Sequence, residues 1–162
     1  LMIPGWAFGS ATSTMVSNII GQGDTDNVIP LIHKITRLCF FSILVLVVPA
    51  WVFHNEMLSL FTADPKLITE SLPSYYVVMA TLIIFSLTMN YYNGVIGTGS
   101  TRVSMLLEVI GVVFYLIFVY FVVLVLNVSL EFAWFSEAEY FISMCILSLI
   151  YLKKGSWKRK II

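Results

Sequence analysis

The stretch VSMLLEVIGVVFYLIFVYFVVLVL, from Val103 to Leu126, decides the fold class of this chain. Its 24 residues carry a single charge, Glu108. A helix of this length rises about 1.5 Å per residue and so crosses a hydrocarbon core of roughly 30 Å. Because lipid offers the backbone no hydrogen-bond partners, the segment must be helical. The sequence therefore predicts a membrane protein.

The composition of the whole chain supports the same prediction. Hydrophobic residues make up 59% and charged residues only 11%, whereas charged residues supply roughly 25% of a soluble domain. Nine basic and nine acidic residues cancel, so we expect no nucleic-acid partner. Cys39 and Cys145 lie in apolar runs without nearby metal-ligating residues, and we expect no metal site and no cofactor. Membrane lipid is an expected partner.

Further apolar stretches predict an all-α, polytopic transmembrane helix bundle with about five spanning helices. Asp64-Pro65 is typical of an N-cap and first-turn proline, and Gly21-Gln22-Gly23 is a plausible helix stop. Short connections favour one bundle without a soluble domain. The expected helices span about residues 1–20, 31–53, 67–96, 103–126 and 132–152, followed by a cytoplasmic tail, 153–162.

The basic residues predict the orientation in the membrane. Five of the nine lie in the C-terminal tail, which the positive-inside rule assigns to the cytoplasm. Alternating sides then puts Lys34, Arg37 and Arg102 inside and only Lys66 outside. We expect a multi-pass plasma (inner) membrane protein with a cytoplasmic C-terminus. The chain begins on the outer side without a signal peptide, which we interpret as a C-terminal part of a larger transporter whose preceding helices are missing.

The first expected helix carries a stripe of small residues. Gly5, Gly9, Ser13 and Ser17 recur at every fourth position and share one face, where they allow a second helix backbone to approach closely. This pattern predicts a helix-packing stripe. A wall facing a water-filled cavity is the alternative, because the other faces of this helix are polar too.

The third expected helix ends in a polar and aromatic patch. Asn90 and Asn93 share a face, with Tyr91 and Tyr92 beside them, in an otherwise apolar region. Two hypotheses fit these four residues. They form interhelical hydrogen bonds, or they line a substrate path in which the aromatic rings face a cation.

Glu108 is the residue that most directly suggests ion coupling. A carboxylate inside the membrane is costly unless it is paired, protonated or exposed to water, and ion pathways are built from such groups. Glu108 is therefore our ion-coupling candidate. The alternatives are an ion pair with Arg102 or another inner-side base, and a tolerated charge without a role.

Four segments together resemble the C-terminal lobe of multidrug and toxic compound extrusion (MATE) transporters. They are GSATSTMVSNIIGQGDTDNV (9–28), LFTADPKLI (60–68), YYNGVIGTGSTR (91–102) and SEAEYFISMCILSLIYLKKGSW (136–157). The resemblance implies a two-lobed, 12-helix transporter that exchanges cationic or amphipathic drugs for sodium or protons. It further implies that the five helices match the eighth through twelfth, and that the missing N-terminal lobe is a partner.

One departure from that family pattern affects the coupling ion. Sodium-coupled members of one branch carry an aspartate in the middle of the helix that matches Tyr75–Ile96, where this chain has no acid. That cation site does not carry over, so Glu108 is the local substitute, and the coupling ion is a proton or sodium.

Three functions remain compatible with the sequence. The first is a cation-coupled multidrug efflux antiporter for amphipathic or cationic compounds, because basic residues, which would repel cations, are scarce within the spans. The second is a flippase for lipid-linked precursors, which would need deep cationic residues to hold a pyrophosphate. The third is a non-transporting membrane assembly subunit. No enzyme-like motif is present, so we do not expect an enzyme.

Overall fold

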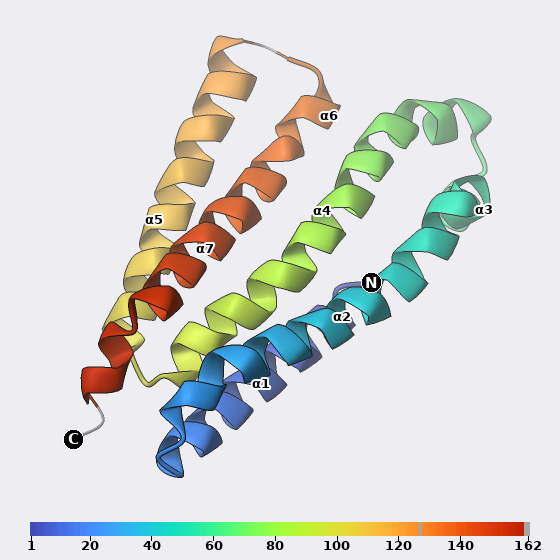
Figure 1. The fold of residues 1–162 in the computed structure, drawn as a ribbon. Helices are drawn as coiled ribbons and strands as arrows, with labels where there is room; N and C mark the ends of the chain where they lie inside the picture. The colour runs from blue at the N-terminus through green and yellow to red at the C-terminus, as the bar shows by residue number, and fades with distance from the viewer. Residues whose placement is uncertain (127, 161–162) are drawn as a thin grey trace.

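The computed structural model describes residues 1–126 and 128–160, which form a bundle of long helices (Figure 1). No strand occurs in these ranges. The elements are α1 (Ile3–Gly21), the 3₁₀ turn η1 (Thr25–Asn27), α2 (Val28–Val52), α3 (His54–Ser59), α4 (Pro65–Gly97), α5 (Thr101–Val119), the π-helix η2 (Tyr120–Val125), α6 (Leu130–Ala133), α7 (Phe135–Lys154) and the 3₁₀ turn η3 (Ser156–Lys160).

The described residues contain four helical stretches that are long and apolar enough to cross a membrane, at Thr25–Val52, Pro65–Gly97, Thr101–Val123 and Phe132–Lys154. The fifth long helix, α1, is richer in Gly, Ser and Thr and does not reach that apolarity. The all-α polytopic bundle expected from the sequence is confirmed.

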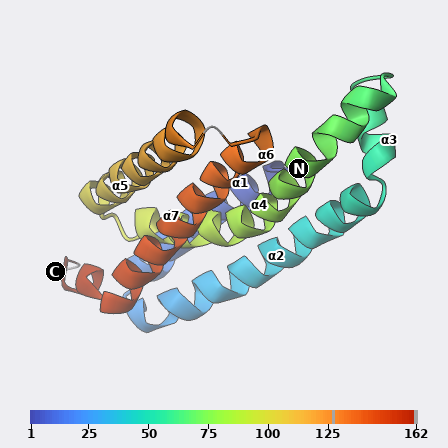
Figure 2. The same cartoon turned by 90° about the horizontal axis from the view of Figure 1, so that it is seen from above.

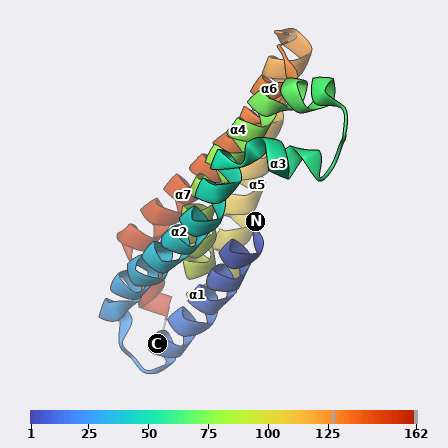
Figure 3. The ribbon, with the colours of Figure 1, turned by 90° about the vertical axis from the view of Figure 1, so that its right-hand side faces the viewer.

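Helix α4 is the centre of the bundle. It packs against α1, α2 and α7, whereas α5 packs mainly on α7 at one side (Figures 2 and 3). Two clusters of buried side chains fill the interfaces, one around Ile32, Val95 and Trp157 and the other around Ile43 and Phe85. A helix that is covered on several sides forms the core of a bundle, in a membrane protein as in a soluble one. Helix α4 therefore holds α1, α2 and α7 in place.

The start of α4 follows from its sequence. The Asp64 side chain accepts a hydrogen bond from the Lys66 backbone N–H at 2.9 Å, and Pro65 occupies the first turn. This N-cap satisfies one of the amide groups that a helix start leaves without a partner. The lead-in and the apolar body form one helix of 33 residues that continues through Pro73.

Two helix ends differ from the sequence expectation. The stretch expected as one helix over 103–126 changes from α-helix to π-helix at Tyr120. The stretch expected over 132–152 is divided into α6 and α7, with the break before Phe135. Extra backbone width in a π-helix moves side chains out of α-helical register, which apolar periodicity alone does not reveal.

The segment expected as a cytoplasmic tail, 153–162, is not a separate tail where the structure describes it. Lys153 and Lys154 complete α7, and η3 folds back onto the bundle. Trp157 is buried, and its indole N–H donates to the Leu152 carbonyl at 3.1 Å. Lys158 Nζ lies 2.6 Å from Asp26, so this segment closes the same end of the bundle at which α2 begins.

Candidate functional site

The small-residue stripe of α1 lies against α4. A Cβ at Gly9 would lie 2.7 Å from the Asn93 amide nitrogen, and one at Gly5 would overlap the Phe85 ring. Ser17 donates a hydrogen bond to the Gly97 carbonyl at 3.0 Å. The backbone of Ser13 faces the same glycine, since a Cβ at Gly97 would lie 2.7 Å from the Ser13 carbonyl oxygen. All four stripe residues therefore lie at one close helix contact.

Asn90 lies in this contact and not on an open path. It is fully buried, its side-chain oxygen accepts from the Thr12 hydroxyl at 3.0 Å, and its amide donates to the Ser86 carbonyl at 2.7 Å. Asn93 is half-buried and donates to the Met89 carbonyl at 2.8 Å. Of these bonds only the one from Thr12 of α1 to Asn90 joins two helices, whereas the bonds to the Ser86 and Met89 carbonyls lie within α4.

The two tyrosines of the patch face different neighbours. Tyr91 is half-buried and makes an edge contact with His33 of α2, with ring centroids 5.8 Å apart. Tyr92 turns toward α5, where its hydroxyl lies 3.5 Å from the Ser104 carbonyl and beside Glu108. The patch therefore does not line one shared surface, and Tyr92 is the member that reaches an ionisable group.

Glu108 lies between two tyrosines from two other helices. The Tyr140 hydroxyl of α7 donates to its carboxylate at 2.6 Å, and the Tyr92 hydroxyl of α4 lies beside the same group. Among the side chains that the structure describes, no basic group lies within salt-bridge distance of Glu108, and Arg102 is exposed. The ion pair with Arg102 that the sequence left open is absent from this structure.

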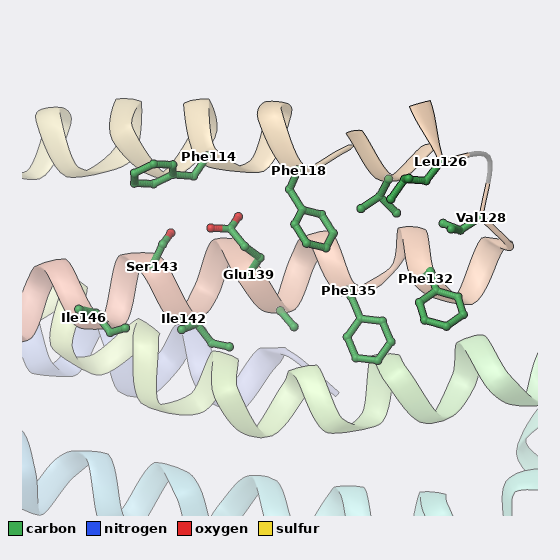
Figure 4. Close-up of a pocket in the computed structure, with 12 residues that line it drawn as sticks. Phe114, Phe118, Leu126, Val128, Phe132, Phe135, Glu139, Ile142, Ser143 and Ile146 are labelled. Carbon is green, nitrogen blue, oxygen red and sulfur yellow. The ribbon is translucent and has the colours of Figure 1, made fainter. Parts of the chain in front are cut away.

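A second carboxylate lies in a cleft between α5 and α7. Figure 4 shows the Glu139 side chain rising from α7 toward α5, between Phe114 and Phe118. Its Oε2 atom is buried and has no hydrogen-bond partner among the described residues. A buried acceptor without a partner carries a desolvation penalty that a bound donor or cation would remove.

The rest of the cleft is apolar and open on one side. Its volume is about 890 Å³, within the range of sites for drug-sized ligands. Phe114 and Phe118 line one wall and Phe132 and Phe135 the other, and no basic residue is among the lining residues that the structure describes. The described residues that line it are Phe114, Phe118, Val122, Leu126, Val128, Phe132, Phe135, Ala138, Glu139, Ile142, Ser143 and Ile146. Aromatic rings around one acid suit an organic cation.

Comparison with known proteins identifies the family. The family model described as MatE matches residues 1–121. This chain belongs to the MatE family. No curated protein and no solved structure matches it. The family is one of transporters, and the chain is accordingly a multi-pass membrane protein of that superfamily.

The MatE match covers one side of the candidate site but not the other. It spans α1 through α5, and so includes Tyr92 and Glu108, whereas Glu139 and Tyr140 lie beyond residue 121 on α7. In this MatE protein, Glu139 and Tyr140 are neighbours on α7 but point to different places. Tyr140 contacts Glu108, and Glu139 faces the cleft.

Sequence reasoning did not single out Glu139. It lies in the first turns of an apolar helix next to Glu137, where acids are ordinary first-turn residues. One signal was available. Ile142, Ser143 and Ile146 follow Glu139 at spacings of three, four and seven, so this acid shares the face of α7 that an apolar stripe occupies.

Proposed function

We propose that this chain forms part of a cation-coupled multidrug efflux antiporter that exports amphipathic or cationic compounds in exchange for protons or sodium. The observation that carries the proposal is the Glu139 carboxylate, with one unpartnered oxygen, in an apolar cleft bordered by four phenylalanines. A flat or bulky apolar cation would bury its rings against the phenylalanines and place its charge near Glu139. Membership of the MatE family supports a transport role.

Glu108 is the proposed ion-coupling residue. Loading it with a proton or sodium ion would remove its net charge and change its bond to Tyr140. Because Tyr140 and Glu139 are neighbours on α7, a shift of this helix against α5 would alter the cleft as well. A ligand shifts a conformational equilibrium only if it binds one conformation more tightly than the other. In this proposal both the coupling ion at Glu108 and the compound in the cleft bind with an affinity that depends on how α7 lies against α5.

The exposed face of α1 supports a second lobe as partner. Ser10, Thr14 and Asn18 are exposed along this helix together with Ala7 and Ala11. Small and polar residues are poor partners for lipid but suit a neighbouring helix or a water-filled path. We therefore propose that this face meets the other lobe of the transporter. We also propose that the protein lies in the plasma (inner) membrane with its C-terminus in the cytoplasm.

The lining of the cleft favours the antiporter over the two alternatives. A flippase for lipid-linked precursors would hold its pyrophosphate with cationic side chains, and none is present among the described residues that border the α5–α7 cleft. A non-transporting assembly subunit would need no unpartnered acid inside an apolar cleft, because such a group costs stability without a compensating contact.

The experiment is an efflux assay on the full-length protein in sealed proteoliposomes. Ethidium, a flat aromatic cation, should leave the loaded side when a proton or sodium gradient is imposed. An amphipathic anion of similar size, 8-anilinonaphthalene-1-sulfonate, should not. Export of the anion in preference to ethidium, or efflux of both compounds at rates that do not depend on the gradient, would contradict the antiporter and favour one of the alternatives.

A further inference from the structure

A basic groove lies on α2, away from the α5–α7 cleft. Two hollows share His33 and Arg37. The first has a volume of about 340 Å³ and is bordered also by Phe40 and Tyr91. The second has a volume of about 680 Å³ and is bordered also by Lys34. His33, Lys34 and Arg37 lie in the second and third turns of α2, at the end of the bundle where Lys158 meets Asp26.

The cations of this groove have no anionic partner within the described residues. Within the described residues, the salt bridges join Lys66 to Glu70 and Lys158 to Asp26, and neither includes a residue of the groove. Lys34 and Arg37 are exposed, and His33 is half-buried against the Tyr91 ring. Together the two hollows are thus bordered by two basic side chains and by an imidazole and a phenol that can donate hydrogen bonds.

An apolar stripe continues from the basic groove along the same face of α2. Its members recur at spacings of three and four residues, which places them in one row on a helix. From the first to the last they span about 21 Å at 1.5 Å per residue, longer than one leaflet of a roughly 30 Å hydrocarbon core. The exposed residues are Leu38 (54%), Phe41 (62%), Val45 (71%), Val48 (51%) and Val52 (65%).

We propose that this surface binds one anionic phospholipid of the bilayer. Lys34 and Arg37 contact the phosphate, His33 and Tyr91 close the side of the headgroup hollow, and an acyl chain lies along the stripe from Leu38 to Val52. Basic pockets between transmembrane helices at the headgroup level hold such lipids through charge, while the chain is held by apolar contact. A small free anion would satisfy the charges but leave the stripe unused. This inference does not depend on the proposed transport function.

The test compares lipid binding to the full-length protein by native mass spectrometry and by a photoreactive lipid. Dioleoyl phosphatidylglycerol should be retained about 30-fold better than dioleoyl phosphatidylcholine, as expected for two basic residues near an anionic headgroup. The double variant Lys34→Gln, Arg37→Gln should lose that preference. The control Lys153→Gln, Lys154→Gln removes two exposed charges from the same end of the bundle. These lysines also lie next to a row of exposed apolar residues, here on α7, so the control resembles the α2 surface in carrying both charge and exposed apolar residues. It should keep the preference, because neither lysine borders the two hollows.

The photoreactive phosphatidylglycerol reports on the unaltered protein, so the proposal stays testable if the double variant does not fold. Its adducts should concentrate on the peptide that contains Leu38–Val52, and excess phosphatidylcholine should compete weakly. Equal retention of the two lipids by the wild type, equal losses in both double variants, or adducts spread evenly over the helices would overturn the proposal. Competition by free glycerol phosphate at the same concentration would indicate a small-anion site and would overturn it too.

Discussion

Replacing Gly97 with leucine is expected to separate α1 from α4 and to abolish most of the folded protein. A Cβ at this position would lie 2.7 Å from the Ser13 carbonyl oxygen and 2.8 Å from Val16 Cβ. The first of these atoms belongs to the backbone, so no side-chain rotation relieves the overlap. Overpacking of this kind costs about 1–3 kcal/mol or more, which lowers the amount of folded protein several-fold. Size-exclusion chromatography of detergent extracts measures the loss.

Gly21→Leu is the matched control for that substitution. Gly21 is also helical, lies at the end of α1, and has no atom within 4 Å of where its Cβ would be. This variant should yield the wild-type amount of monodisperse protein. Equal losses in the two variants, or normal recovery of Gly97→Leu, would show that α1 does not pack on α4 as described.

Replacing Glu108 with glutamine is expected to uncouple efflux from the ion gradient without unfolding the protein. Glutamine keeps a side-chain oxygen that can accept the Tyr140 hydroxyl, now 2.6 Å from the carboxylate, but it cannot hold a charge or exchange a proton. Ethidium efflux from proteoliposomes should fall about tenfold or more and should no longer respond to imposed proton or sodium gradients, because glutamine can neither bind nor release the coupling ion.

Two further variants separate coupling from simple stability. Tyr140→Phe removes the hydrogen bond but leaves the acid in place, so the gradient response should persist with altered strength. Arg102→Gln combined with Glu108→Gln should recover nothing, because the exposed Arg102 does not pair with Glu108. Recovery in this double variant would restore the ion-pair hypothesis, and unchanged gradient-driven efflux in Glu108→Gln would remove this residue from the mechanism.

Local features of the fold could be predicted from the sequence because local physics determines them. Apolar length predicts spanning helices, Asp64-Pro65 predicts a helix start, and the four-residue spacing of Gly5, Gly9, Ser13 and Ser17 puts them on one face of α1. What that face contacts depends on tertiary packing, which brings together residues as far apart as Ser17 and Gly97.

Tertiary contacts account for what sequence reasoning missed. Tyr140 lies 32 positions from Glu108, so no spacing rule could connect them, and the exposed Arg102 seemed the nearer partner along the chain. Trp157 belongs to a stretch rich in lysine that reads as a solvated tail, yet it is buried in the core. Spacing alone puts Glu139 on the apolar face of α7, but the cleft that this acid borders forms when α5 packs beside α7.

The most direct test of the account is equilibrium binding of ethidium to the purified, full-length protein, with Glu139→Gln and Glu137→Gln compared side by side. Glu137 lies on the same helix but borders a different cavity, beside Met2 and Trp134, so its variant controls for loss of an acid. If Glu139 holds the cation in the α5–α7 cleft, Glu139→Gln should weaken binding about 10- to 100-fold, the equivalent of about 1.5–3 kcal/mol for a charge-assisted contact, while Glu137→Gln should bind like the wild type. Wild-type affinity in Glu139→Gln, or the same loss in both variants, would contradict the claim that this cleft receives the transported cation.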